Sequence, residues 1–173
     1  MTKHILLILT LFILCNELNS QVPYTNEQWS FEVERIEEPV ESHYQDGFHL
    51  FMERRTVDRT KYLTLEIDIF KFDQVIENPL AFSDSLLAME FLAGINEQGE
   101  ISLLKRDDIE VDSIPGILAN IRLQIDKSNL LNIVYLSFCK ENIYYVIMYG
   151  SPTQTFEAIE EHAKSFRFVR DQE

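Results

Sequence analysis

The sequence predicts an α+β domain built on one antiparallel β-sheet of about six strands, with helices on both faces. Three observations lead to this prediction. Residues 130–139 and 143–149 are apolar on both faces and are separated by three polar residues, which is typical of central strands covered from two sides. Other segments alternate apolar and polar residues with the period of a half-buried strand. Two more carry the apolar spacing and end signals of helices.

The first half of the chain is expected to hold three strands and one helix. The strand candidates cover residues 31–36, 48–57 and 62–72. In the last of these, leucine and isoleucine alternate with polar residues, so Glu66 and Asp68 are expected to point to water. A helix is expected over residues 84–93, with Ser83 as its N-cap and Gly94 just after its end.

The second half is expected to be a meander followed by a helix. Its strand candidates cover residues 101–104, 109–111, 117–125, 130–139 and 143–149. Pro115-Gly116 is expected to break the chain, and Lys140-Glu141-Asn142 is short enough to make the last two strands antiparallel. The final helix is expected to begin with Ser151 as N-cap and Pro152 at its first position, and its buried stripe reaches Phe166.

The first twenty residues are expected to be a secretory signal rather than part of the fold. Residues 5–14 are apolar apart from Thr10, a length that suits a signal and is too short to span a bilayer. The alternative is a lipid anchor at Cys15, disfavoured because Leu14 stands where lipoprotein processing needs a small side chain. The expected division is a signal at 1–20, an irregular segment at 21–30 and a single domain at 31–170, in a periplasmic or secreted protein without a transmembrane span.

The net charge of the chain limits the classes of partner that it is expected to bind. The formal net charge is −14, which argues against nucleic acids and anionic lipid surfaces and permits cations and basic protein surfaces. One basic cluster stands out, and it is expected to pair with the protein's own acids; it consists of Arg54, Arg55, Arg59 and Lys61. After cleavage Cys139 would be the remaining thiol, and it is expected to be a small buried hydrophobe.

The C-terminal half resembles a known family. An acid-flanked strand at 108–111 is followed by Ile114-Pro115-Gly116 and Ala119, and the final helix ends in Ser165-Phe166-Arg167-Phe168. In these features residues 109–169 resemble the PsbP-like superfamily, which includes DcrB-like bacterial exported proteins and lipoproteins. The resemblance implies an antiparallel sheet between helices, and it implies no activity because members of the superfamily have different roles.

Asp108, Glu110 and Asp112 are the candidate metal ligands. Their spacing matches the first ligands of a calcium-binding loop, but such a loop needs glycine where Ser113 stands and a glutamate where Ala119 stands. The preferred interpretation is a solvated strand face that discourages pairing with another sheet edge. No metal site and no cofactor is therefore expected.

No catalytic constellation is recognised. His43, His49 and His162 could in principle bind zinc, but the spacing of the first two fits no short zinc motif. The serine in Gly150-Ser151-Pro152 lacks the context of a nucleophile. The protein is therefore expected not to be an enzyme.

The expected function is binding or assembly. The first hypothesis is a protein partner engaged through an acidic surface, and an immunity-type protein that neutralises a basic toxin is one version of it. The alternative is a carrier of a small molecule or lipid, which requires an apolar cavity larger than a water molecule. A hydrolase that uses one of the histidines is the least supported hypothesis.

Overall fold

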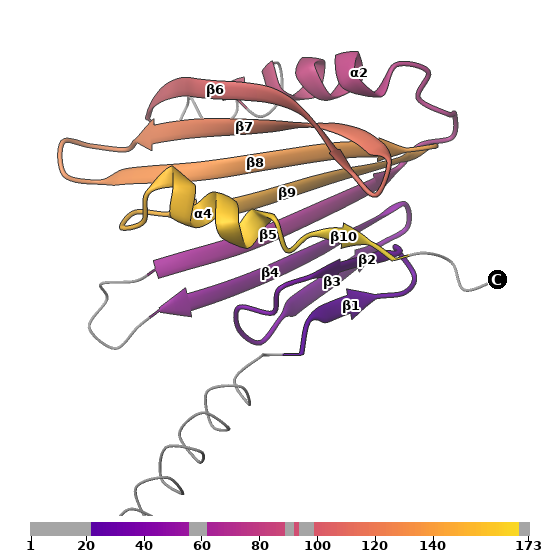
Figure 1. Ribbon diagram of the computed structural model, residues 1–173, viewed down its shortest axis with the longest axis horizontal. Helices are drawn as coiled ribbons and strands as arrows, with labels where there is room; N and C mark the ends of the chain where they lie inside the picture. Colours follow the sequence, from indigo (N-terminus) through magenta and orange to yellow (C-terminus); the bar gives the residue numbers. More distant parts are fainter. Residues whose placement is uncertain (1–21, 56–61, 89–91, 94–98, 170–173) are drawn as a thin grey trace, which may run out of the picture.

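Two β-sheets and two helices organise the chain in the computed structural model, which describes residues 22–55, 62–88, 92–93 and 99–169 (Figure 1). The large sheet is antiparallel and has the strand order β3 (Val40–Tyr44), β4 (Gly47–Arg55), β5 (Tyr62–Lys71), β9 (Ile143–Ser151), β8 (Leu130–Lys140), β7 (Ile114–Gln124), β6 (Glu100–Val111). The small sheet has the order β1 (Tyr24–Asn26), β2 (Phe31–Val33), β10 (Arg167–Phe168). The helices are α2 (Pro79–Leu86) and α4 (Phe156–Ala163).

The hairpin of β8 and β9 lies in the middle of the large sheet. Lys140 pairs with Ile143 across a two-residue turn, and the antiparallel pairing continues from there to Asn132 and Ser151. Val134, Leu136 and Val146 are all buried. The prediction of two central antiparallel strands with both faces buried is confirmed.

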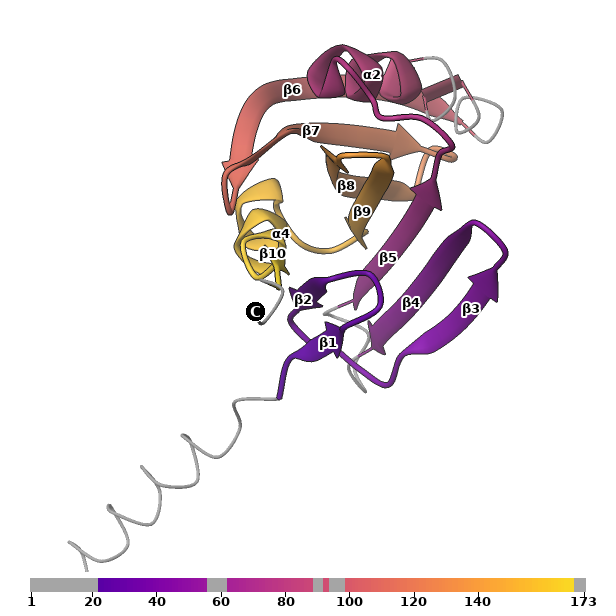
Figure 2. The ribbon, with the colours of Figure 1, turned by 90° about the vertical axis from the view of Figure 1, so that its right-hand side faces the viewer.

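Alternate residues of β8 enter two separate hydrophobic clusters. Val134, Leu136 and Phe138 pack with α4 and the small sheet, whereas Tyr135 and Cys139 pack on the opposite side with residues from the α2 region. The large sheet curves around α4 and the small sheet, and α2 lies outside the curve over β7 and β8 (Figure 2). One side is thus covered by a helix together with a second sheet, and the other only in part.

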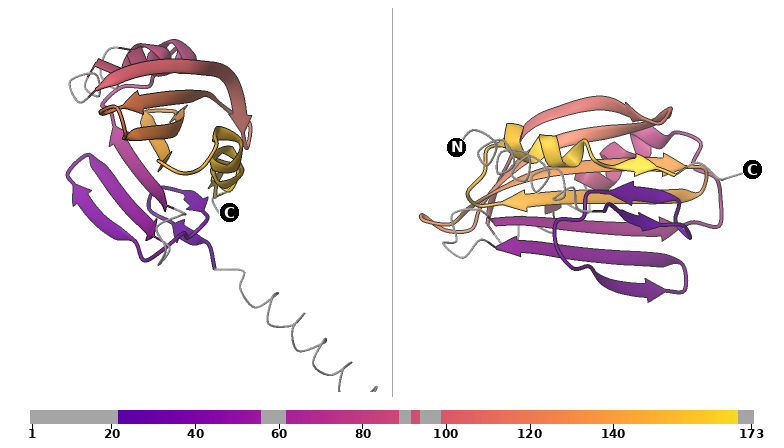
Figure 3. Two further views of the ribbon diagram at one scale, coloured as in Figure 1. Left: turned by 90° about the vertical axis from the view of Figure 1, so that its left-hand side faces the viewer. Right: turned by 60° about the horizontal axis from the view of Figure 1, so that its bottom comes forward.

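The expected antiparallel α+β fold is confirmed, but its details differ. The large sheet has seven strands where about six were expected, and the three-stranded sheet was not expected. Segment 21–30, expected to be irregular, contains β1, and segment 31–36 forms the short β2 outside the large sheet. The small sheet crosses in front of the magenta strands in the right-hand view of Figure 3, and Phe31 of β2 contacts Phe48 of β4. The strand expected at 31–36 is thus present over Phe31–Val33, whereas β1 was missed because three residues are too few to show a period of two.

Helix α2 begins earlier than expected. Asn78 is its N-cap, accepting a hydrogen bond of 3.2 Å from the backbone N–H of Ala81, and Pro79 occupies the first position. Ser83, expected as the cap, is instead buried inside the helix. Gly94, expected just after the helix, lies outside the described residues.

Helix α4 begins later than expected. Thr155 is its N-cap, accepting from the backbone N–H of Ala158 at 3.4 Å. Ser151, expected as the cap, is the last residue of β9 and pairs with Asn132 of β8. Its hydroxyl accepts from the backbone N–H of Gln154 at 3.1 Å, so it stabilises the turn before the helix rather than the helix itself.

The β6–β7 hairpin also differs from the prediction. The two short segments expected at 101–104 and 109–111 form one strand, β6, whose register shifts at a β-bulge between Leu103 and Lys105. Pro115-Gly116 does not break the chain, because Pro115 is the second residue of β7, beside the turn, where a missing N–H is tolerated.

Residues 1–20, including Cys15, lie outside the described residues. Among the residues that the structure describes, no helix is long and apolar enough to cross a membrane.

Candidate functional site

The face of the large sheet that α2 leaves uncovered combines polar and apolar side chains from β4, β5 and β9. His49 pairs across the strands with Asp68, which pairs in turn with Val146. Two residues along β5, Glu66 pairs with Met148. The intervening Ile67 is fully buried on the other side, so alternation along β5 brings the two carboxylates to the uncovered face.

A cavity of about 520 Å³ lies between α2 and this face. Its lining is mostly aromatic and aliphatic, and consists of Asp68, Phe70, Phe72, Phe82, Leu86, Tyr135, Tyr144, Val146 and Met148. Asp68 is the one charged residue among them. A volume of this size is within the range of small-molecule sites, which combine an apolar wall with a few polar groups.

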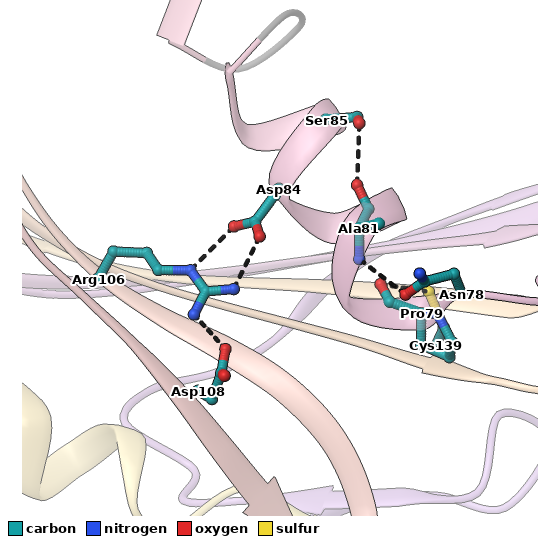
Figure 4. Close-up of polar contacts among 8 residues, drawn as sticks. All are labelled: Asn78, Pro79, Ala81, Asp84, Ser85, Arg106, Asp108 and Cys139. Atoms are coloured by element: carbon teal, nitrogen blue, oxygen red, sulfur yellow. Dashed lines mark hydrogen bonds and ion pairs between the residues drawn. The ribbon is translucent and has the colours of Figure 1, made fainter.

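Polar contacts hold α2 in place as one wall of the cavity (Figure 4). Arg106 of β6 donates two hydrogen bonds to Asp84 of α2, from Nε at 2.9 Å and from Nη2 at 2.8 Å, and it also pairs with Asp108. Such a two-pronged arginine–carboxylate contact fixes orientation as well as distance. Cys139 lies against the start of the helix, with its Sγ 3.9 Å from the carbonyl oxygen of Pro79. Burial raises the pKa of the Cys139 thiol to about 11, so it stays protonated near neutral pH.

Two buried tyrosines, Tyr135 and Tyr144, contribute polar atoms to the lining of the cavity. The hydroxyl oxygens of Tyr135 and Tyr144 lie 2.9 Å apart, and burial raises the pKa of both groups. Phe82 meets the Tyr144 ring edge-on with 5.3 Å between the ring centres. Both phenols stay protonated near neutral pH, and one of their two O–H groups donates to the other hydroxyl, so the pair leaves at most one O–H for an oxygen atom of a bound molecule.

At the border of the cavity, Asp68 belongs to a group of three polar side chains. The Nδ1 atom of His49 lies 2.8 Å from Oδ1 of Asp68 and 3.8 Å from Oε1 of Glu66. Burial raises the pKa of Glu66, and the neighbouring charge of Asp68 raises it further, while His49 lowers it in part. The two carboxylates therefore lie closer together than their charges favour.

Replacing Glu66 with glutamine is expected to stabilise the protein near neutral pH. The pKa of Glu66 is higher in the folded protein than the ordinary glutamate value of 4.5, so the native carboxyl contributes stability that is present below pH 4.5 and lost as the pH rises through its folded pKa. Because the side chain is 40% exposed, the gain for Glu66→Gln should stay below about 1 kcal/mol. Urea unfolding near neutral pH and below about pH 4 should show the gain only in the first case. The exposed Glu161→Gln is the control, and a Glu66→Gln protein that is less stable at neutral pH would contradict the argument.

The candidate metal ligands from the sequence are not brought together. Asp108 pairs with Arg106, and Asp112 lies in the turn after β6, where its Oδ2 accepts from the backbone N–H of Phe168 at 2.9 Å. Glu110 is exposed on β6, opposite Pro115. Within the described ranges, the one group of three potential ligands is the cluster of His49, Glu66 and Asp68.

The three histidines also lie apart. Nε2 of His43 lies 3.5 Å from Oε2 of Glu41. His43 pairs with Phe48, whose side chain enters the core, so His43 lies on the opposite face of the sheet from His49. His162 of α4 lies 2.8 Å from Glu34. These three histidines therefore do not form one zinc site, although His49 contacts the two acids of β5.

The basic cluster is partly described. Arg54 donates a hydrogen bond of 2.8 Å to the carbonyl oxygen of Ile36, and Arg55 pairs with Glu53. Both thus have partners within the protein. Arg59 and Lys61 lie outside the described residues.

A serine, a histidine and an aspartate face one another across three strands, because Ser42 of β3 pairs with His49 and His49 with Asp68. Activation of a serine requires a hydrogen bond between serine and histidine. Among the described residues, the hydrogen bond of His49 goes to Asp68. Ser42, His49 and Asp68 therefore have the residue types of a nucleophilic triad without the hydrogen bond between serine and histidine.

Solved structures share this arrangement of strands and helices. One is PsbP from the cyanobacterium Synechocystis sp. PCC 6803, which is 8% identical in sequence. The match covers 86% of the present chain and 92% of PsbP, with a TM-score of 0.55. PA94 of Pseudomonas aeruginosa, a protein of unknown function, is 13% identical. The match covers 83% of the present chain and 88% of PA94, with a TM-score of 0.50. A protein from Bacteroides thetaiotaomicron is 12% identical with a TM-score of 0.47, and the chain spans half of its length. No family model and no curated protein matches the chain.

The fold is therefore PsbP-like. The similarity to PsbP extends over most of both chains, which confirms the resemblance seen in residues 109–169. At 8% identity it establishes the fold alone, and function has to be argued from the site.

Proposed function

We propose that this protein is a non-catalytic binding protein that holds an apolar small molecule or lipid in the cavity between α2 and the large sheet. The observation that carries the proposal is the cavity of about 520 Å³ with its mostly apolar lining. Burial of apolar surface supplies the binding free energy in such a site, at about 25 cal/mol per Å² removed from water.

The aromatic residues at the cavity support this function. Phe70 is 46% exposed and Phe72 is 36% exposed, although large apolar side chains are usually buried. A bound apolar molecule would remove both rings from water.

The first test is a direct binding measurement with the neutral apolar dye Nile red. The full chain is expected to bind one dye molecule with a dissociation constant of roughly micromolar order. Leu86→Trp places a larger side chain in the cavity and should weaken binding at least about tenfold. Fluorescence anisotropy at fixed dye concentration measures both.

The matched control is Leu103→Trp, since Leu103 is a 46% exposed leucine on β6 that does not line the cavity. This variant should bind the dye like the unchanged protein. Absence of dye binding, or an equal loss in both variants, would refute the proposal.

A protein partner engaged through an acidic surface is the second candidate, and the net charge of −14 favours it. Association of this kind is fast and weakens steeply with salt. Pull-down with the immobilised chain should then recover a basic protein at low salt and release it at high salt. Recovery of nothing at low salt, even after crosslinking, would exclude this candidate.

We also propose that the protein is exported, on the basis of the apolar run at 5–14. Mass spectrometry of the mature protein is expected to show an N-terminus at Gln21. A lipid-modified N-terminal Cys15 would instead support the anchor.

A further inference from the structure

We propose that His49, Glu66 and Asp68 form a binding site for a divalent transition-metal ion, with Zn²⁺ as the ion that fits best. This site goes beyond the proposed binding of an apolar molecule, and either proposal can fail without the other.

The geometry of the three donor atoms supports a metal ion. Nδ1 of His49, a carboxylate oxygen of Glu66 and a carboxylate oxygen of Asp68 all lie within 4.8 Å of one another. Donor atoms about 2.0–2.2 Å from a tetrahedral zinc ion lie roughly 3.3 Å apart. The distances of 2.8 Å and 3.8 Å from Nδ1 to the two carboxylates lie on either side of that value, so small side-chain rotations suffice.

The sheet fixes these donors before a metal ion arrives. His49 and Asp68 are direct partners in the β4–β5 ladder, and Glu66 lies two residues from Asp68 on the same face. Sites on strands hold their ligands more precisely than sites on loops, which lowers the entropic cost of binding.

The charges of the cluster also favour a cation. His49 is the one basic group that pairs with these two carboxylates among the ion pairs of the described residues. A divalent cation would offset the repulsion between the carboxylates of Glu66 and Asp68, which lie two residues apart on one face of β5.

The exposure of the cluster allows a metal ion to enter and leaves room for a water ligand. The side chains of His49, Glu66 and Asp68 are 24%, 40% and 26% exposed. Three protein ligands and one water is the arrangement of open zinc sites, whereas structural sites use four protein ligands. One imidazole with two carboxylates suits Zn²⁺ better than Mg²⁺ or Ca²⁺, which prefer oxygen ligands alone.

The test is calorimetric titration of the full chain, first treated with a chelator, with ZnCl₂. One ion per chain is expected to bind with a dissociation constant of roughly micromolar order. His49→Gln and Asp68→Asn should each weaken binding at least about tenfold, because each removes a ligand. Ca²⁺ and Mg²⁺ should bind much more weakly.

The matched control is His162→Gln. Nδ1 of His162 also lies 2.8 Å from a carboxylate oxygen, that of Glu34, but among the described residues no third ligand completes that pair. Zinc affinity should be unchanged in this variant. Absence of binding at millimolar zinc, binding that survives His49→Gln, or an equal loss in His162→Gln would overturn the proposal.

Glu66→Gln provides a second measurement in a variant that is expected to remain folded. Zinc should raise the thermal midpoint of the unchanged protein and of His162→Gln, because a ligand that binds only the folded state stabilises it. In Glu66→Gln, which is expected to be more stable than the unchanged protein without metal, the rise should be lost or greatly reduced. An equal rise in Glu66→Gln would show that this carboxylate is not a ligand and overturn the three-ligand site.

Discussion

Phe138→Ala is expected to remove about 3–5 kcal/mol of folding stability. Phe138 is fully buried on β8, and its ring stacks on Phe166 with 5.5 Å between ring centres and meets Phe168 edge-on, also at 5.5 Å. Truncation would open a cavity between the large sheet, the end of α4 and the small sheet. Since domains of this size have total stabilities of about 5–15 kcal/mol, the variant should lose a large part of its stability in urea unfolding.

The control for this prediction is Phe70→Ala on the uncovered face of the same sheet. Phe70 is 46% exposed, so its truncation should cost less than about 1 kcal/mol and should instead weaken Nile red binding. A Phe138→Ala protein that is as stable as Phe70→Ala would contradict the packing described for the aromatic cluster.

Gly116→Ala is expected to cost about 1–3 kcal/mol or more, although alanine suits a strand at least as well as glycine. A Cβ atom at this position would lie 2.3 Å from Cδ1 of Phe138 and 2.4 Å from the carbonyl oxygen of Ser137. The ring is confined by Phe166, and the oxygen is part of the β8 backbone that pairs with β7. Neither atom can withdraw without disturbing the centre of the sheet. Thermal unfolding should show a clearly lower midpoint.

Gly150→Ala is the matched control because Gly150 is also a strand glycine with ordinary backbone angles. The nearest atom to its added Cβ would be Oγ1 of Thr64 at 2.8 Å, which belongs to a side chain rather than to the backbone. Its cost should stay below about 1 kcal/mol. Equal losses in the two variants would mean that general glycine effects, and not the Phe138 contact, decide the result.

The sequence predicted best those parts of the fold that depend on local pattern. The period of two along 62–72 identified β5 and the direction of Glu66 and Asp68, and the short turn at 140–142 identified the central hairpin. The helix starts were wrong where two capping residues competed. Asn78 rather than Ser83 caps α2, and Ser83 lies buried inside the helix. The contact of Arg106 with Asp84, the next residue, helps to fix the helix in this position.

The candidate site could not be predicted because it depends on contacts between distant segments. Glu66 and Asp68 meet His49 only through the register of β4 and β5, and no two-residue turn fixes that register, because residues 56–61 separate the strands. The cavity depends in addition on the position of α2. A signal for the metal cluster was present, since a histidine and two acids occupy alternating positions of adjacent strand candidates, but pairing them required the register.

The small sheet joins opposite ends of the chain, since Phe31 of β2 pairs with Phe168 of β10 and the backbone N–H of Val169 donates to the carbonyl oxygen of Ser30 at 2.9 Å. During synthesis β2 emerges long before β10, so this part of the protein cannot close until residues 167–168 have been made. Such a high contact order is typical of domains that fold in milliseconds to seconds rather than microseconds. A nascent chain that ends before Arg167 would therefore leave the edge of β2 that pairs with β10 without its partner strand.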